Sequence, residues 1–166
     1  MSVEFNFVRS KSYKSAIKKF PDAWNEDMSI MKDYLLLEPG QRVVEIGAGS
    51  GFFSFEISER IGDKGKLLII EPSLDQLFPL IEKNIKNMEF FCTTAEDFKL
   101  PTTSKIDRIW SRGAFHHVTD KTKVMRNLAS ISEKKARCVI FDIFTGSPVA
   151  NFSILIYLKP AQLVTK

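Results

Sequence analysis

Residues 43–58, VVEIGAGSGFFSFEIS, decide the fold of this chain. The stretch begins as an apolar strand, passes through Gly47, Gly49 and Gly51, and continues with apolar residues at helical spacing. Glycine lets a chain turn tightly and lets a ligand approach the backbone closely. The helix after the turn presents unpaired backbone N–H groups to such a ligand. The stretch therefore predicts a strand–turn–helix unit with a binding site at its turn.

The rest of the chain alternates between strand and helix patterns. The sequence predicts strands at 42–46, 66–71, 88–92, 105–111 and 136–144, and helices at 10–20, 22–37, 51–61, 74–84, 121–132 and 149–158. Two of these strands are continuously apolar, which is typical of a parallel sheet covered on both faces. Right-handed crossovers then favour a doubly wound, mostly parallel α/β sheet, in which ligands bind at the carboxyl ends of the strands.

Size and composition indicate one globular domain. The chain has 166 residues, of which 44% are hydrophobic and 27% charged. No apolar run approaches the roughly 18 residues of a membrane span, and the N-terminus lacks a secretory signal pattern, so we expect a cytoplasmic protein. Cys92 and Cys138 both fall in predicted strands, where we expect buried, reduced thiols. Neither cysteine has the spacing of a metal site.

The net charge of +4 is unevenly placed. Residues 9–19, RSKSYKSAIKK, contain lysines and an arginine but no acid. One interpretation is a basic arm for nucleic acid, an anionic substrate or a membrane surface. The other, which we favour, is the solvated face of a helix.

The residues around the glycine turn restrict the ligand. A dinucleotide fingerprint would place a third glycine where Phe52 stands, and the turn lacks the G-K-[ST] ending of a P-loop. Glu45, just before the turn, disfavours a pyrophosphate and favours a ligand that carries an ammonium group. Glu71, at the end of the second strand, can accept hydrogen bonds from both hydroxyls of a ribose. A ligand with a ribose and an ammonium group but no phosphate is S-adenosylmethionine.

Four segments in order resemble the class I S-adenosylmethionine-dependent methyltransferases, over about residues 25–145. They are VVEIGAGSG (43–51), LIIEPS (68–73), CTTAEDFKLP (92–101) and IDRIWSRGAFHHVTD (106–120). The resemblance implies a Rossmann-like sheet with helices on both faces. It also implies a helical segment or lid at residues 1–40 and an S-adenosylmethionine-binding domain at residues 41–166. S-adenosylhomocysteine would be the product of the reaction.

The resemblance also implies roles for particular residues. The cofactor-binding residues would be Glu45, Gly47, Ala48, Gly49, Gly51, Glu71, Pro72, Thr94, Ala95, Glu96, Ser111 and Arg112. The glycine turn would wrap the methionine portion, Glu45 would meet its amino group through water, and Glu71 would hold the ribose. Ala95 would bond the adenine through its backbone N–H. Thr94 departs from the family pattern, since many members carry an aspartate there to accept the adenine amino group, and Glu96 is the alternative acceptor.

Two histidines follow the fourth predicted strand, where the resemblance places the methyl sulfonium. His116 is the candidate general base, because imidazole titrates near neutrality, and His117 is the second choice. Arg112 either binds an anionic acceptor or braces the loop. We expect no metal ion. Aromatic residues near the N-terminus, including Trp24, form either a lid over an apolar acceptor or the core of a helix packed on the sheet.

Three hypotheses of function remain open. The first, which we favour, is methyl transfer to a small-molecule acceptor; the alternatives are a non-catalytic binding or scaffold subunit and a nucleic-acid methyltransferase. Only five strands and one further apolar segment are expected, so we expect the chain to lack the usual C-terminal hairpin of the family. The strand at 136–144 would then be an exposed edge, open to a second copy or to a partner subunit.

Overall fold

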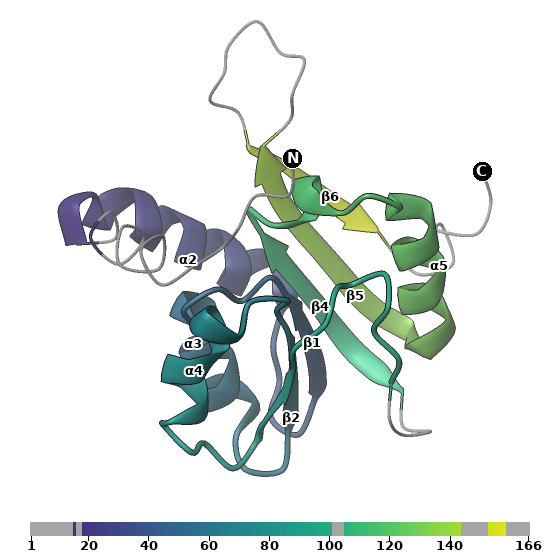
Figure 1. Cartoon of the computed structure of the whole chain (residues 1–166), viewed down its shortest axis with the longest axis horizontal. Helices are drawn as coiled ribbons and strands as arrows, with labels where there is room; N and C mark the ends of the chain where they lie inside the picture. The colour runs from purple at the N-terminus through teal and green to yellow at the C-terminus, as the bar shows by residue number, and fades with distance from the viewer. Residues whose placement is uncertain (1–14, 16–17, 101–104, 144–152, 159–166) are drawn as a thin grey trace, which may run out of the picture.

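The structure, a computed structural model, describes residues 15, 18–100, 105–143 and 153–158. Within these residues six strands form one sheet in the order β3–β2–β1–β4–β5–β6 (Figure 1). The strands are β1 (Arg42–Ile46), β2 (Lys66–Ile70), β3 (Met88–Phe91), β4 (Ile106–Arg112), β5 (Ser132–Ile143) and β6 (Ser153–Leu158). The first five strands are parallel, and β6 is antiparallel to β5. The predicted doubly wound, mostly parallel sheet is thus confirmed, with the order reversing between β1 and β4.

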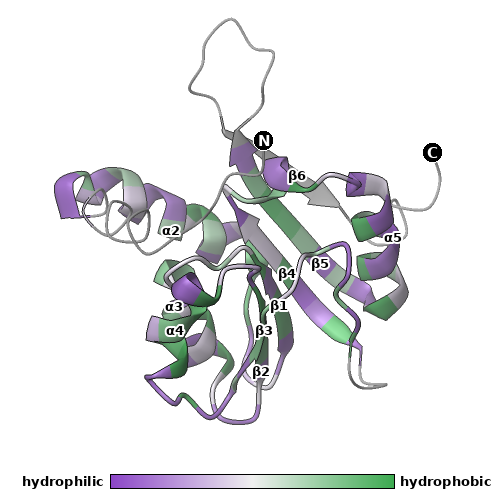
Figure 2. Cartoon of the chain, in the orientation of Figure 1, coloured by the Kyte–Doolittle hydropathy of each residue, from purple (hydrophilic) through white to green (hydrophobic). Residues whose placement is uncertain are grey.

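Helices cover both faces of the sheet. They are α2 (Pro21–Leu35), α3 (Phe52–Ile61), α4 (Leu74–Ile81), a short 3₁₀ helix η1 (Phe115–His117) and α5 (Lys121–Ile131). Buried residues of α2, α3 and α4 form one core cluster with the sheet, and those of η1 and α5 form a second. Side chains alternate across β1, so that Val43 enters the first cluster and Val44 the second. Apolar strands accordingly lie between the helices; α2 and α5 have largely polar outer faces (Figure 2), whereas α4 exposes Leu74 and Phe78.

The C-terminal part of the sheet differs from the prediction. Residues 153–158 were expected to be helical but form β6, which pairs with β5 from Cys138 to Ile143; residues 149–152 of the same predicted helix lie outside the described residues. The segment SILIYL is rich in β-branched and aromatic residues, and a short apolar run does not distinguish strand from helix by periodicity. The expectation that the fifth strand is an exposed edge is therefore wrong, because β6 pairs with β5 along that edge.

Helix α2 is fastened to the sheet at its C-terminal end. Arg108 of β4 donates from Nε to the carbonyl oxygen of Leu35 at 2.8 Å, and Arg137 of β5 donates to that of Tyr34 at 3.3 Å. Cations at this end of a helix also interact favourably with its dipole. Trp24 of α2 is only 7% exposed, which confirms the interpretation of this side chain as core.

The two cysteines have different surroundings. Cys138 is buried in β5, and burial raises the pKa of its thiol to about 12. Cys92 follows the last residue of β3 and is exposed, so the expectation of a buried thiol there is wrong. Both thiols are free. Among the described helices, none has the length and apolar character needed to span a bilayer.

Candidate functional site

A cavity of about 510 Å³ opens at the carboxyl ends of β1, β2 and β4. It is lined by residues 46–50, 70–72, 94–96 and 112–114, together with Phe52, Phe53, Gln76, His117 and Val118. This is the point at which the strand order of the sheet reverses, where open α/β folds bind their ligands. Its volume lies within the roughly 300–1,000 Å³ of small-molecule sites.

The three glycines of the turn after β1 all have positive φ, at 70° for Gly47, 55° for Gly49 and 86° for Gly51. A Cβ atom at Gly47 would collide with the side chain of Ala114, and one at Gly51 would collide with Leu80. A Cβ atom at Gly49 would meet nothing within 4 Å, because this residue faces the cavity. Gly47 and Gly51 therefore serve packing, whereas Gly49 keeps the cavity open beside the backbone.

Glu71 connects the glycine turn to the end of β2. Its Oε2 accepts the backbone N–H of Gly49 at 3.1 Å, and its Oε1 accepts that of Ser73 at 3.0 Å. Burial raises the pKa of Glu71, and these two hydrogen bonds oppose the shift. The side chain lines the cavity, as predicted from its position after the second strand.

Glu45 lies behind the glycine turn and does not line the cavity. It is 2% exposed, and its Oε2 accepts the hydroxyl of Ser54 at 2.6 Å. Burial raises the pKa of Glu45 to about 7; the Ser54 hydrogen bond lowers it, and the nearby Glu71 raises it. The carboxyl is thus poised to gain or lose a proton near neutral pH. The expected water-mediated contact with a ligand stays a prediction.

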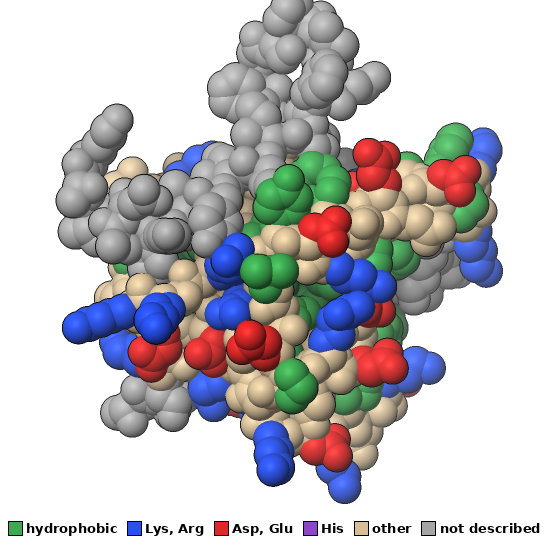
Figure 3. Space-filling model, turned by 180° about the vertical axis from the view of Figure 1, so that it is seen from behind, with side chains coloured by type: hydrophobic (Ala, Val, Ile, Leu, Met, Phe, Trp, Pro, Cys, Tyr) green, Lys and Arg blue, Asp and Glu red, His purple; other side chains and the backbone are tan. Residues whose placement is uncertain are grey.

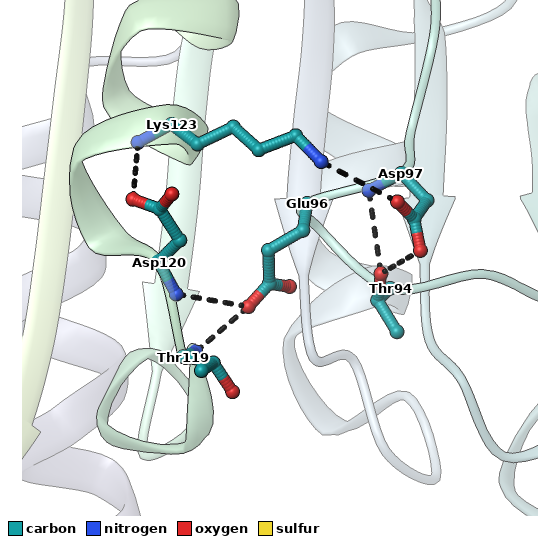
Figure 4. Close-up of polar contacts among 6 residues, drawn as sticks. All are labelled: Thr94, Glu96, Asp97, Thr119, Asp120 and Lys123. Atoms are coloured by element: carbon teal, nitrogen blue, oxygen red, sulfur yellow. Dashed lines mark hydrogen bonds and ion pairs between the residues drawn. The ribbon is translucent and has the colours of Figure 1, made fainter.

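The loop after β3 is tied to the start of α5 (Figure 4). The hydroxyl of Thr94 donates to Oδ2 of Asp97 at 3.0 Å, and Asp97 pairs with Lys123 at 3.5 Å. Glu96 Oε1 accepts the backbone N–H of Thr119 at 2.7 Å. Thr94, Ala95 and Glu96 all line the cavity, and the side chains of Thr94 and Glu96 each make a hydrogen bond within the protein. These bonds hold the loop at the cavity wall.

The two residues that end β4 have different positions. Ser111 is fully buried and donates its hydroxyl to the carbonyl oxygen of Ile46 at 3.1 Å. It does not line the cavity, so its predicted contact with the cofactor finds no support in its position. Arg112 lines the cavity, with its Nη2 2.5 Å from Oδ2 of Asp27 and its guanidinium carbon 4.4 Å from the ring centre of Trp24. The bracing interpretation of Arg112 is therefore the one that the geometry favours.

His116 and His117 lie in η1, which follows the loop after β4. His116 Nδ1 is 2.6 Å from Oδ1 of Asp142 in β5, and the His116 backbone N–H donates to Oδ2 at 2.9 Å. The two imidazole rings lie 3.8 Å apart between centres. His117, rather than the predicted His116, lines the cavity. Both histidines lie in one turn of a short 3₁₀ helix, so their positions in the sequence do not determine which of them faces the cavity.

Three polar residues of the site were missed by the sequence analysis: Asp27, Ser54 and Asp142. Two of them interrupt apolar patterns. Asp27 stands between Trp24 and Met31 on the buried face of α2, and Asp142 stands in the apolar run of β5. An acid in such a position needs a partner, which is a signal that was available in the sequence. Among the described residues, no group of three or more His, Cys, Asp and Glu side chains is arranged to hold a metal ion.

Comparisons with known proteins agree with the fold and the cavity. The methyltransferase domain family matches residues 37–151. The uncharacterised methyltransferase YcgJ of Bacillus subtilis is 32% identical over 126 residues, which cover 72% of this chain and 47% of that protein. The ubiquinone/menaquinone biosynthesis C-methyltransferase UbiE of Vibrio campbellii is 25% identical over 109 residues, which cover 63% of this chain and 42% of that protein. The chain thus spans less than half the length of either relative.

The fold is also similar to that of a solved S-adenosylmethionine-dependent methyltransferase from Aquifex aeolicus, with a TM-score of 0.64 and 25% identity. That similarity covers 81% of this chain and 77% of the Aquifex chain. The family match includes β1 to β5 and thus the strand ends that form the cavity. The chain therefore belongs to the methyltransferase domain family and has the Rossmann-like fold of class I S-adenosylmethionine-dependent methyltransferases.

Proposed function

We propose that this chain binds S-adenosylmethionine in the cavity at the ends of β1, β2 and β4 and transfers its methyl group to a small-molecule acceptor. One observation carries the proposal. Gly49 adopts a left-handed conformation, leaves open space on its cavity side and donates its N–H to Glu71, the acid that follows β2. Backbone exposed beside a carboxylate suits a ligand that combines a positively charged amino acid with a ribose.

The residues present fit this ligand. A carboxylate offers about four lone-pair positions, and the two backbone N–H groups on Glu71 use two of them. The others remain for the two hydroxyls of a ribose. Glu71 and Glu96 both line the cavity, so the local charge of the cavity favours a cationic ligand over a phosphate.

We infer further roles from the same geometry. The backbone N–H of Ala95 would bond the adenine, because the loop that carries it lines the cavity and is held by Glu96 and Asp97. Residues 1–40 would form an N-terminal helical segment beside a binding domain of residues 41–166, and the contact of α2 with Arg112 through Asp27 supports a role of this segment at the cavity. We also keep the expectation of a cytoplasmic location.

S-adenosylmethionine supplies a methyl group on a positively charged sulfur when bound. The contribution of this chain is chiefly to orient the two reactants, which is the main requirement of such a transfer. Phe52 and Phe53 would keep water from the cavity, and His117 is the imidazole placed to accept a proton from an acceptor. His116 would then hold His117 rather than act as the base.

Calorimetric titration with S-adenosylmethionine and S-adenosylhomocysteine tests the proposal. We expect binding by the native chain and a loss of about tenfold or more in Glu71→Gln, since a hydrogen bond to a charged group contributes roughly 1.5–3 kcal/mol. Glu82→Gln, an exposed acid just after α4, is the matched control and should bind normally. Equal affinity in all three proteins would contradict the assignment of Glu71.

Transfer itself is tested with S-adenosylmethionine labelled in its methyl group and an extract of small metabolites. We expect label in a small, extractable product with the native chain and none with Glu71→Gln. Binding without transfer would instead favour the scaffold alternative.

The nucleic-acid alternative has less support. The basic stretch at residues 9–19 lies largely outside the described residues. On the face shown in Figure 3, lysine and arginine side chains alternate with acids and form no continuous basic surface. Lys32 and Arg60 both pair with Glu56, and Lys66 pairs with Glu89. Nucleic-acid phosphates are attracted by positively charged surfaces, and basic side chains paired with acids do not form such a surface.

A further inference from the structure

The wall of the cavity that follows β4 carries an ion pair whose acid, Asp27, is buried. Arg112 lines the cavity, and its Nη2 lies 2.5 Å from Oδ2 of Asp27. The guanidinium carbon also lies 4.4 Å from the ring centre of Trp24. Both partners belong to α2, and Asp27 is only 8% exposed. The positive charge nearest the open cavity is therefore held by a carboxylate and an aromatic face that come from the N-terminal helix.

The other charged side chains that line the cavity are also committed within the described part of the chain. Glu71 accepts the backbone N–H groups of Gly49 and Ser73. Glu96 accepts that of Thr119. An anionic acceptor would have to displace Asp27 from Arg112, and a cationic acceptor would have to share Glu71 or Glu96 with the backbone N–H groups that these acids accept, or enter without a partner. Either event is costly in a partly apolar site.

The remaining wall on this side is apolar and partly aromatic. Phe52, Phe53, Ala114 and Val118 line it. The rings of Phe52 and Trp24 lie edge to face with their centres 5.0 Å apart, and those of Phe52 and Phe53 are equally close. Aromatic surfaces of this kind contact flat apolar molecules well.

We propose that the methyl acceptor of this site is an uncharged, flat, largely apolar molecule, and that Asp27 sets this preference by neutralising Arg112. The inference rests on the proposed methyl transfer and adds the class of acceptor to it. Asp27 is a positioning residue, because it acts through Arg112 and does not line the cavity. Its removal should change which charge the site accepts rather than whether S-adenosylhomocysteine binds.

Three probes with the same ring system test the preference: 2-naphthol, 2-naphthoate and 2-naphthylmethylammonium. Each is titrated calorimetrically at neutral pH into the chain saturated with S-adenosylhomocysteine. We expect the neutral probe to bind at least about tenfold more tightly than either ion. A tenfold change in affinity corresponds to about 1.4 kcal/mol, and an unpaired charge in such a site costs more than that. Equal or tighter binding of the anion, or no binding of 2-naphthol, would overturn the proposal.

Asp27→Asn tests the part played by the ion pair. Arg112 then lacks the Asp27 carboxylate, so we expect 2-naphthoate to gain about tenfold relative to 2-naphthol. Asp22→Asn is the matched control, since it makes the same change at an exposed position of the same helix, and its ratio should equal that of the native chain. An unchanged ratio in Asp27→Asn would remove Asp27 from the account.

A double variant guards against loss of folding. Asp27→Asn with Arg112→Gln replaces both charges of the pair at once, which is usually better tolerated than removing one partner. It should keep the preference for 2-naphthol and show no gain for 2-naphthoate; a gain would mean that Arg112 is not the group that holds the anion.

Titration of S-adenosylhomocysteine alone comes first. If it fails, the proposed function fails, and the three probes still rank the charge preference of the ligand-free cavity.

Discussion

The two walls of the cavity are built in different ways. The wall made by residues 47–51 depends on backbone conformation, with three glycines at positive φ within five residues. The wall made by residues 112–118 depends on side chains from distant parts of the chain, with Asp27 of α2 holding Arg112 and Asp142 of β5 holding His116. A single added Cβ atom should therefore have a large effect on the first wall. The second should respond in smaller steps, because each partner contributes one bond.

Gly47→Ala should have the largest effect. The new Cβ would meet the side chain of Ala114, and overpacking costs about 1–3 kcal/mol on top of about 1–2 kcal/mol for a left-handed alanine. We expect urea denaturation to give a loss of about 3 kcal/mol in the free energy of unfolding. Gly40→Ala, also at positive φ but with nothing within 4 Å of its Cβ position, should lose only the backbone part. Equal losses in the two variants would contradict the packing role of Gly47.

Glu45→Gln should change how stability depends on pH. Glu45 has a pKa of about 7 in the fold and 4.5 as its ordinary value. Between these values the folded chain holds a proton that the unfolded chain releases, so the stability of the native protein falls as pH rises through this window. The total is about 3 kcal/mol. Glutamine can still accept the Ser54 hydroxyl but does not titrate.

The native chain and Glu45→Gln are compared by urea denaturation at pH 5 and pH 8. We expect the free energy of unfolding of the native chain to fall from pH 5 to pH 8 by more than that of Glu45→Gln. Parallel pH profiles would mean that Glu45 keeps an ordinary pKa in the fold.

Gly49→Ala should separate ligand binding from stability. Its Cβ would point into open space, so the loss of stability is the left-handed backbone cost of about 1–2 kcal/mol, as in Gly40→Ala. Binding of S-adenosylhomocysteine should fall in Gly49→Ala but not in Gly40→Ala, because only Gly49 lines the cavity. Calorimetric titration of the two variants measures the difference. Normal binding by Gly49→Ala would mean that the ligand does not approach this backbone.

Asp142→Asn should have the smallest effect, with a stability loss of about 1 kcal/mol. Its clearest result is spectroscopic. The carboxylate of Asp142 can only accept a hydrogen bond, so the neutral imidazole of His116 should carry its hydrogen on Nδ1. The chain has two histidines, so ¹⁵N spectra can be assigned with His117→Gln. A population of the Nε2–H form in the native chain equal to that in Asp142→Asn would contradict this contact.

The same contrast explains what the sequence could predict. The strand at Arg42–Ile46 has the predicted bounds, and Asp120 caps α5 by accepting the N–H of Lys123 at 2.8 Å. Both depend on local pattern and on residues a few positions apart. The cavity also contains Gly49, Glu71 and Ala95, because the carboxyl ends of parallel strands meet at one edge of the sheet.

What the sequence could not predict depends on distance along the chain. Ser111 and His116 were placed in the site from their position after a strand, but their side-chain directions are set by Ile46 and Asp142. The pairing of Asp27 with Arg112 joins residues in separate elements, and no local pattern specifies it. Residues 153–158 were assigned to a helix because a short apolar run fits either element, and only pairing with β5 decides between them.

The most direct test of the central claim is a map of the S-adenosylhomocysteine site by backbone amide NMR of the native chain. We expect the amide signals of Gly49, Ser73 and Ala95 to shift on titration, since these residues surround the end of β2 and line or border the cavity. Signals from the far end of α5, such as Ser130, should stay in place. A folded chain whose spectrum does not change at saturating ligand, or changes only away from these three residues, would contradict binding of S-adenosylmethionine in this cavity.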